Sequence, residues 1–419
     1  MVSVAVPRFA ALHVADYRRY FIFGLLAMMA DNIEHVISYW VIFLEFHSPA
    51  LAGFAVISHW VPFLFFSVLA GALADRYDRR KLIQVGQALF MIASAAWGLL
   101  FLTGTLQVWH AVVILLIHGA AGVIIAPAAQ LMLHDLVGAA QLGSAIRLNA
   151  TSRYLAILLG PAVGGGLMLL LGPAWGLLAN VLIYVPFTVF LFRTPYTGHA
   201  RQAERGRRPL RLGPGEILAV LGEARADRRL MTMIVLGAAT SFFVGSAFQA
   251  QMPEYAHRLG ATEAKVWYSI LLAGNAAGAV LGAIVFESLD LRPSARAAIL
   301  YAGAWAATLV LFPFAGSYAS AVTLLVLGGA FNIAFTSMAQ TLVQLLAPPD
   351  LRGRMVGLFN TAMLGLRAGS GVTVGVLGAV VGVHWSLALS AAAVALTAAA
   401  LYAREVTSAA PSRSALPLR

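Results

Sequence analysis

Long apolar runs alternate with short polar segments along almost the whole 419-residue chain. A membrane-spanning helix needs about 20 apolar residues, and the sequence contains about twelve runs of that kind. They cover residues 20–46, 50–74, 82–103, 108–133, 142–171, 174–192, 230–252, 266–286, 295–314, 319–346, 355–381 and 385–403. Because helices satisfy their own backbone hydrogen bonds in lipid, the pattern predicts an all-α membrane protein with about twelve transmembrane helices.

The composition indicates that lipid is the main solvent of this chain. Hydrophobic residues make up 60% of the sequence and charged residues only 11%, with a mean hydropathy of +0.83. Soluble domains carry roughly 25% charged residues, so a water-soluble protein is excluded. The formal charge of +11 would suit nucleic acid, but the cations lie in short loops and termini. We therefore expect membrane lipid, and no nucleic acid, as a partner.

The sequence has no cysteine, which excludes disulfides, thiolate metal sites and cysteine nucleophiles. It also lacks a phosphate-binding glycine loop of the Walker type, so ATP-driven transport is not expected. We expect no cofactor, no metal and no enzymatic activity. Residues 1–19 lack the short apolar region and the cleavage site of a signal peptide, so the first apolar run is predicted to stay as a membrane helix.

The cations divide the predicted loops into two sets. Loops on one side hold nearly all of them: Arg18, Arg19, Arg76, Arg79, Arg80, Lys81, Arg193, Arg205, Arg207, Arg208, Arg228, Arg229, Arg292, Arg296, Arg352 and Arg354. Loops on the other side hold only Arg258 and Lys265. Because cationic loops resist translocation, the pattern predicts a multi-pass protein of the bacterial inner (plasma) membrane with both termini in the cytoplasm.

The long central segment divides the chain into two halves. We predict a six-helix bundle over residues 1–193, a basic cytoplasmic linker over 194–229, a second six-helix bundle over 230–405 and a cytoplasmic tail over 406–419. The first part of the linker is rich in Arg, Gly and Pro and reads as flexible. The second part, from Glu216 to Arg229, is predicted to form an interfacial amphipathic helix. The even split is typical of six-plus-six transporters, which can work as monomers.

The polar block between the second and third runs holds five residues of a known loop signature: Gly71, Asp75, Arg76, Arg79 and Arg80. They match Gly-x-x-x-Asp-Arg-x-Gly-Arg-Arg/Lys, so the chain resembles the major facilitator superfamily, with Asp78 in place of the second glycine. The resemblance implies two pseudo-symmetric bundles. It also implies that the block is a cytoplasmic latch, since the family's Asp pairs with cations and helix ends across that face. A purely topogenic basic loop would leave Gly71 and Asp75 unexplained.

A second motif narrows the resemblance: Gly160, Pro161, Gly164 and Gly165. It is similar to the Gly-Pro-x-x-Gly-Gly signature of drug and metabolite exporters, and small residues of this kind let membrane helices approach closely. Residues 148–153 and 351–358 resemble enterobactin exporters and related bacterial secretion permeases. The resemblance therefore implies a drug or siderophore exporter.

Ionisable side chains inside the first run are the strongest candidates for chemistry. Asp31, Glu34, His35 and Ser38 are spaced to share one helical face, and Asp31 falls near the bilayer midplane. A central charge costs at least about 2.5–3.5 kcal/mol, so this stripe is expected to face a cavity or a partner. We interpret it as the proton-coupling site. The alternative is an Asp31–His35 pair that only locks the first helix to a neighbour.

Three more ionisable residues are assigned to the same proton-coupling and substrate cavity: His118, Arg153 and Arg367. We expect at least one arginine, preferably Arg153, to pair with the acidic stripe; the alternative is that each caps backbone carbonyls. His118 either relays a proton or donates one hydrogen bond to a neighbouring helix. His59, in the second run, is interpreted as structural.

Polar side chains that could contact a substrate are Ser38 and three residues of the second half: Gln249, Asn332 and Gln340. The leading hypothesis is a secondary transporter that exports a small organic molecule (a siderophore, drug or similar amphipathic metabolite) by proton antiport and alternating access. An uptake permease or facilitator is the alternative in the same class. A membrane-embedded enzyme, using His134 and Asp135, is a distant one that lacks a nucleophile.

Overall fold

The computed structural model describes residues 9–46, 49–195, 214–245, 247–259, 264–289 and 291–407, and these residues form helices joined by turns, with no strand among them. The first half holds η1 (Ala10–His13), α1 (Ala15–Phe46), α2 (Pro49–Arg76), α3 (Arg79–Leu102) and α4 (Val108–Arg193). The second half holds α6 (Pro214–Ala226), α7 (Arg228–Phe243), α8 (Ala247–Ala250), α9 (Met252–Arg258), α10 (Ala264–Ser288), α11 (Ala295–Leu311), η2 (Phe312–Phe314), α12 (Tyr318–Leu346), α13 (Arg352–Asn360), η3 (Thr361–Gly365), α14 (Arg367–Ser370), η4 (Gly371–Val376), α15 (Leu377–Val381) and α16 (Val383–Thr407).

The long helical segment α4 contains three membrane spans. Its backbone leaves helical geometry only at Gly138 (φ 72°) and Gly172 (φ 79°). Positive φ is cheap for glycine alone, so each glycine turns the chain back into the bilayer without an intervening loop. The fourth, fifth and sixth predicted runs are therefore the three parts of α4.

The predicted twelve spans agree with the structure. Among the described residues, nine helices are long and apolar enough to cross a membrane, α4 included. Because α4 holds three spans, and the broken helix from α13 to α15 adds one more, the architecture is a twelve-span membrane fold. The eleventh span differs from its prediction in being interrupted by π-helical turns, η3 and η4, a feature that often marks functional positions.

The seventh span also differs from its prediction. The run 230–252 was expected to be continuous, but α7 ends at Phe243 and Gly245 takes a positive φ of 48°. The short helices α8 and α9 then carry the chain onward. The break follows from Gly245, since the left-handed conformation interrupts the helical hydrogen-bond ladder.

Two helices, α6 and α7, follow the predicted flexible part of the linker. The helix expected from Glu216 is present as α6, and Asp227 then caps α7 by accepting hydrogen bonds from Arg229 N (2.8 Å) and Leu230 N (3.0 Å). In the structure α7 begins at Arg228, and α16 runs to Thr407, the last described residue. Most of the segment predicted to be flexible, 196–213, lies outside the described residues.

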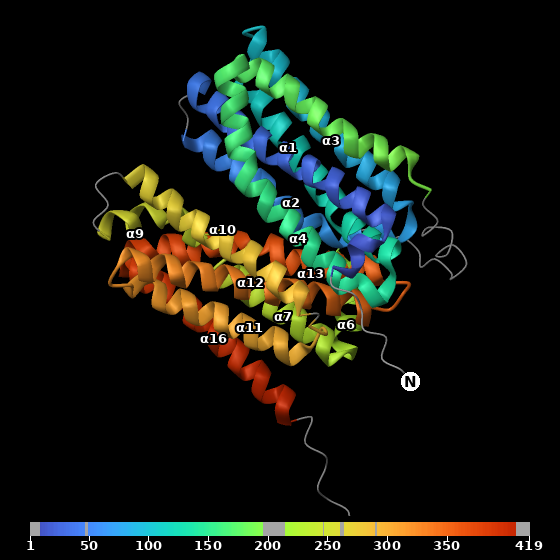
Figure 1. The fold of residues 1–419 in the computed structure, drawn as a ribbon, viewed down its shortest axis with the longest axis vertical. Helices are drawn as coiled ribbons and strands as arrows, with labels where there is room; N and C mark the ends of the chain where they lie inside the picture. The colour runs from blue at the N-terminus through green and yellow to red at the C-terminus, as the bar shows by residue number, and fades with distance from the viewer. Residues whose placement is uncertain are drawn as a thin grey trace, which may run out of the picture.

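The two halves of the chain form two helix bundles (Figure 1). The blue-to-green half packs α1, α2 and α3 against α4, and the yellow-to-red half packs α10, α11 and α16 around α12 and α7. The bundles meet where α2 lies against α13 and α4 against α10, near α6. We call this end the basic end, because it carries the cationic block 71–81 together with Arg352 and Arg354.

The contact between α2 and α13 depends on glycine. A methyl group at Gly353 would collide with the carbonyl oxygen of Gly71, and one at Gly357 would collide with that of Ser67. Further along the same face, a methyl at Gly365 would meet the backbone of Leu64. Small residues allow this close approach of membrane helices, so the two bundles are in backbone contact at the basic end.

Candidate functional site

The acidic stripe of α1 contacts a histidine of α4. His118 Nδ1 lies 2.9 Å from Glu34 Oε1, and His118 Nε2 lies 3.1 Å from Asp31 Oδ1. Asp31 and Glu34 stand three residues apart, so one helical turn presents both carboxylates to the same ring. A protonated imidazole has two N–H donors, so His118 can bridge both carboxylates in its charged form.

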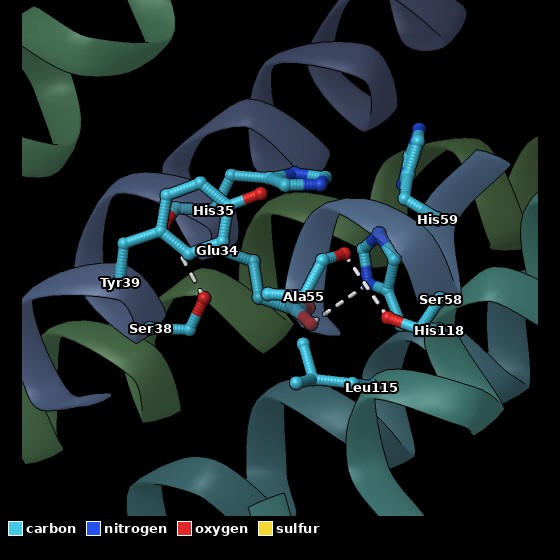
Figure 2. Close-up of a pocket in the computed structure, with 9 residues that line it drawn as sticks. All are labelled: Glu34, His35, Ser38, Tyr39, Ala55, Ser58, His59, Leu115 and His118. Atoms are coloured by element: carbon cyan, nitrogen blue, oxygen red, sulfur yellow. Dashed lines mark hydrogen bonds and ion pairs between the residues drawn. The ribbon is translucent and has the colours of Figure 1, made fainter. Parts of the chain in front are cut away.

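Two further histidines complete the cluster. His35 Nδ1 lies 2.8 Å from the backbone oxygen of Asp31 and 3.8 Å from its Oδ1. The ring of His59, from α2, has its centroid 5.0 Å from that of His35 and 5.7 Å from that of His118. Figure 2 shows the three rings around one pocket. His59, interpreted from sequence as structural, thus belongs to the ionisable cluster.

The pocket beside the cluster is small, about 260 Å³ including space open to solvent. Its lining residues are Glu34, His35, Ser38, Tyr39, Ala55, Ser58, His59, Leu115 and His118 (Figure 2). Pockets for organic ligands span roughly 300–1,000 Å³. In this conformation the pocket is therefore too small for a siderophore-sized molecule. Of the predicted substrate contacts, Ser38 lines it and donates to His35 O at 3.3 Å.

Two groups of this network are buried. Glu34 is 2% exposed and His118 is 5% exposed. A buried ion is costly unless it is paired and hydrogen-bonded, and here the imidazole of His118 supplies the pairing for both carboxylates. Loss of a proton from the ring, or its gain by either carboxylate, would therefore change the contact between α1 and α4.

The arginines expected to pair with the stripe lie elsewhere. Arg367 donates from Nε to Met363 O at 3.2 Å, and its guanidinium stands 4.8 Å from the ring centroid of Trp60. Arg153 is exposed on α4, and no ion pair joins it to the stripe within the part of the chain that the structure describes. Histidines, and not arginines, provide the counter-charges of Asp31 and Glu34.

The other predicted substrate contacts belong to the second half. Asn332 accepts a hydrogen bond from the Tyr154 hydroxyl at 3.4 Å, which places it at the junction between the bundles. Gln340 is half-buried on α12, and Gln249 is exposed on α8. These side chains lie outside the lining of the pocket at the histidine cluster.

Two residues of the predicted latch, Gly71 and Asp75, contact the other bundle at the basic end. Asp75 accepts hydrogen bonds from Gly353 N (2.6 Å) and Arg354 N (3.0 Å), and Arg354 Nη1 lies 3.7 Å from it. Both N–H groups belong to the first turn of α13, where unsatisfied donors and the helix dipole favour an anion. Gly71 lets the backbones touch. The contact crosses from one bundle to the other.

The cations of the signature have different contacts. Arg79 pairs with Asp135, and Arg80 pairs with Asp78 at 2.9 Å and donates to Thr194 O at 2.8 Å. Arg76 is exposed and lies 5.9 Å from the ring centroid of Tyr77. Asp78 replaces the signature's second glycine by capping α3, since its side chain accepts from Arg80 N.

A second crossing contact lies at the corresponding place in the other half. Glu287, at the end of α10, accepts from Arg147 Nε at 2.7 Å and from the Ser144 hydroxyl. Arg147 and Glu287 are 5% and 2% exposed. The position equivalent to the first block retains an acid, Glu287, which was the signal available in the sequence. Its partners Ser144 and Arg147 were not predicted.

The linker helix and one buried amide pair add to this closure. Glu216 of α6 lies 2.6 Å from Arg354 Nε, and Gln130 donates to Asn360 Oδ1 at 3.0 Å. Glu216 thereby ties the linker to the same arginine that faces Asp75. The basic end is therefore held by hydrogen bonds and ion pairs from five helices: α2, α4, α6, α10 and α13.

The glycine motif of the fifth span packs against the helix that carries the stripe. A methyl at Gly160 would lie 2.5 Å from Asn32 Cβ, and one at Gly164 would lie 3.5 Å from Ile33 Cα. Gly165 faces open space, and Pro161 is exposed on a backbone that keeps helical dihedral angles. The motif thus fixes the approach of α4 to α1 beside Asp31 and Glu34.

Comparison with known proteins identifies the family of this chain. The family model described as "transmembrane secretion effector", within the major facilitator superfamily, matches residues 6–415. The chain belongs to this family. It is 23% identical over 384 residues to the uncharacterized MFS-type transporter YfiS of Bacillus subtilis, covering 83% of this chain and 86% of that one.

Two further similarities place this secretion-effector family member among transporters. It is 21% identical over 166 residues to the staphyloferrin A transporter of Staphylococcus aureus, a match that covers 39% of this chain and spans less than half (42%) of that relative. Its fold matches a bacterial homologue of the iron transporter ferroportin in the outward-facing state with a TM-score of 0.69. That match has 18% identity and covers 94% of this chain and 99% of the other.

Proposed function

We propose that this transporter exports a small organic anion, such as a carboxylate-bearing siderophore, from the cytoplasm by proton antiport and alternating access. The observation that carries the proposal is the buried Asp31–His118–Glu34 network beside a pocket. When a proton binds to one of these groups or leaves it, the charges and the hydrogen bonds of the network change together. The groups lie at the contact between two helices of one bundle. This is the arrangement that coupling requires.

Protons and substrate would use the network in turn. When the site is open to the outside, a proton that enters neutralises one carboxylate and weakens its pairing with His118. When it opens to the cytoplasm, the arriving substrate favours release of that proton, and the carboxylate pairs with the ring again. A ligand shifts such an equilibrium only through its differential affinity for the two states, and the titrating groups supply that difference.

The closed basic end supports the assignment of this conformation as outward-facing. The positive-inside rule places the basic end in the cytoplasm, so the contacts of Asp75 and Glu287 would close the cytoplasmic gate. Both contacts are hydrogen-bonded sets at a bundle end, and each can be exchanged for water when the gate opens. Alternating access then consists of breaking these contacts while the opposite end closes.

The substrate class rests on two observations. Arg153 and Arg367 are cations within membrane spans, and neither is paired with the acidic stripe. An anionic substrate would complement their charges. The relative named as a staphyloferrin A transporter supports a siderophore. Aromatic surface near Arg367, such as Trp60, would suit the apolar part of an amphipathic molecule.

Everted membrane vesicles that are acid inside provide the test. Iron-free staphyloferrin A and ethidium are added separately to weakly buffered medium, and external pH is recorded. Antiport predicts that the transported compound triggers proton release, and that Asp31→Asn or Glu34→Gln abolishes it. Asp16→Asn is the matched control, because Asp16 lies at the start of the same helix, half-exposed and paired only with Arg19 among the ion pairs of the described residues. Substrate movement without proton release, equal in all variants, would identify a facilitator.

A further inference from the structure

The three histidines beside the pocket suggest a second ligand for this protein. We propose that His35, His59 and His118, with Asp31, form a binding site for one divalent first-row transition-metal ion such as Zn²⁺. This metal site does not depend on proton antiport or on an organic substrate. From the sequence alone we expected no metal.

The geometry brings the ligand atoms together from three helices. One ring nitrogen from each histidine lies within 4.8 Å of those of the other two. Tetrahedral ligands at bonds of about 2.0–2.1 Å stand about 3.4 Å apart. Small rotations of the imidazoles therefore bring them to bonding distance. Asp31 Oδ1 is already 3.1 Å from His118 Nε2, which makes this carboxylate the fourth ligand.

Hydrogen bonds already orient two of the rings. Metal-binding histidines usually donate the N–H of the other ring nitrogen to a carboxylate or a backbone carbonyl, which fixes the tautomer. His35 Nδ1 lies 2.8 Å from the Asp31 carbonyl, and His118 Nδ1 lies 2.9 Å from the Glu34 carboxylate. Both contacts leave Nε2 of the ring available as a ligand. Glu34 is thus assigned to hold His118 and not to bind the metal.

A buried ring nitrogen without a partner, in His59, points to a ligand at this place. Within the described residues, His59 Nδ1 is a buried atom that makes no hydrogen bond, while His118 Nε2 and Asp31 Oδ1 face each other at 3.1 Å. Buried polar atoms are normally paired, so each exception needs an explanation. A cation that accepts lone pairs from these atoms would satisfy them together. Figure 2 shows His118 with Glu34 on one side and His59 nearby.

The donor set selects the kind of ion. Three imidazoles and one carboxylate suit Zn²⁺ and other divalent transition metals such as Co²⁺. Ca²⁺ and Mg²⁺ prefer six or more oxygen ligands, and the chain has no cysteine to attract soft ions. A dication would also balance the two negative charges of Asp31 and Glu34.

Metal titration of the purified full-length protein tests the site. The protein carries a tag without histidine and is first stripped with a chelator. We expect Zn²⁺, titrated against a competing chromophoric chelator, to bind at one ion per chain. Co²⁺ should give the intense visible absorption of tetrahedral coordination. His59→Gln and His35→Gln should each weaken Zn²⁺ binding at least tenfold, while His384→Gln, a histidine remote from the cluster, should leave it unchanged.

Other results would overturn the proposal. Zn²⁺ binding well below one ion per chain would do so, as would equal affinity in wild type and His59→Gln. His59 is the decisive position, since its Nδ1 makes no hydrogen bond that the fold depends on. Thermal unfolding of each variant in chelator confirms that it is folded. Because the readout is binding, failure of the proton-antiport experiment leaves this result unaffected, and the reverse also holds.

Discussion

The carboxylate of Asp75, at the end of α2, accepts a 2.6 Å hydrogen bond from the backbone N–H of Gly353, at the start of α13. The Asp75 side chain is 7% exposed, and the neighbouring N–H of Arg354 donates to its second oxygen. An anion held by a helix N-terminus gains from both the free donors and the helix dipole. This single side chain therefore links the two bundles where they meet.

Removing the charge of Asp75 should open the basic end. Hydrogen bonds to charged groups contribute about 1.5–3 kcal/mol each, so Asp75→Asn should raise the population of the open form about tenfold or more. Spin labels on cysteines introduced at Tyr77 and Leu345 report the separation by double electron–electron resonance. A longer distance should appear in Asp75→Asn. Asp78→Asn, in the same loop, is the control, and equal distance distributions in both variants would contradict the latch.

Adding a methyl group at the contact between α2 and α13 should also open the basic end. Gly353→Ala places its Cβ against the carbonyl oxygen of Gly71, and overpacking of this kind costs typically 1–3 kcal/mol. We expect a lower unfolding temperature and a longer distance between the same two spin labels. Gly166→Ala serves as the control because its Cβ would face open space. If both substitutions behave alike, the close approach of α2 and α13 has no role.

The Arg147–Glu287 pair should be energetically coupled. Removing one partner of a buried ion pair costs about 3–5 kcal/mol, because the other charge is left buried alone. Arg147→Met and Glu287→Gln should therefore each lower the unfolding temperature, and the double variant should lose less than their sum. Glu254→Gln is the control, since the exposed Glu254–Arg258 pair should contribute no more than about 1 kcal/mol. Additive single effects would show that the pair is not coupled.

The absence of cysteine allows a direct test of orientation. A single cysteine at Thr105, in the exposed turn after α3, should react with a membrane-impermeant maleimide in intact spheroplasts. A single cysteine at Tyr77, at the basic end, should react only after the membrane is permeabilised. The unmodified protein should not react at all. The reverse pattern would place the basic end outside and refute the proposed gate assignment.

The sequence predicted the positions of ionisable residues along each helix better than their partners. Helical periodicity was sufficient to put Asp31, Glu34 and His35 on one face of α1. Which residue faces that stripe depends on how α4 lies against α1, and this is a tertiary relationship that local pattern does not contain. The sequence therefore favoured Arg153 as the counter-charge, whereas the structure supplies His118.

The same reasoning applies to turns and to the latch. Gly138 and Gly172 let one span follow another without a polar loop, so hydropathy found the spans but not the tight turns between them. The loop signature identified Gly71 and Asp75, since a basic loop needs neither. It did not identify Gly353 as the partner, because the contact joins residues far apart in the sequence. In the sequence, Glu287 stands at the position of the second half that corresponds to the loop signature. No comparable pattern indicated Arg147 as its partner.

Replacing His118 should separate substrate exchange from proton coupling. His118→Asn removes the ring that contacts both Asp31 and Glu34, so the two carboxylates lose their shared counter-charge while the gate contacts of Asp75 remain. We expect substrate-triggered proton release to fall at least tenfold, about 1.4 kcal/mol or more of coupling. Exchange of labelled for unlabelled substrate across the membrane should continue, because exchange needs no net proton movement.

The matched control for this prediction is His110→Asn on the same helix, where the ring accepts a hydrogen bond from the backbone N–H of Gln107 and packs against Trp109, away from the stripe. Both activities should be retained there. If His118→Asn loses exchange together with proton release, the ring is needed to bind substrate or to hold α1 against α4. If it keeps both, the carboxylates couple without it, and the centre of the proposed antiport site moves to Asp31 and Glu34 alone.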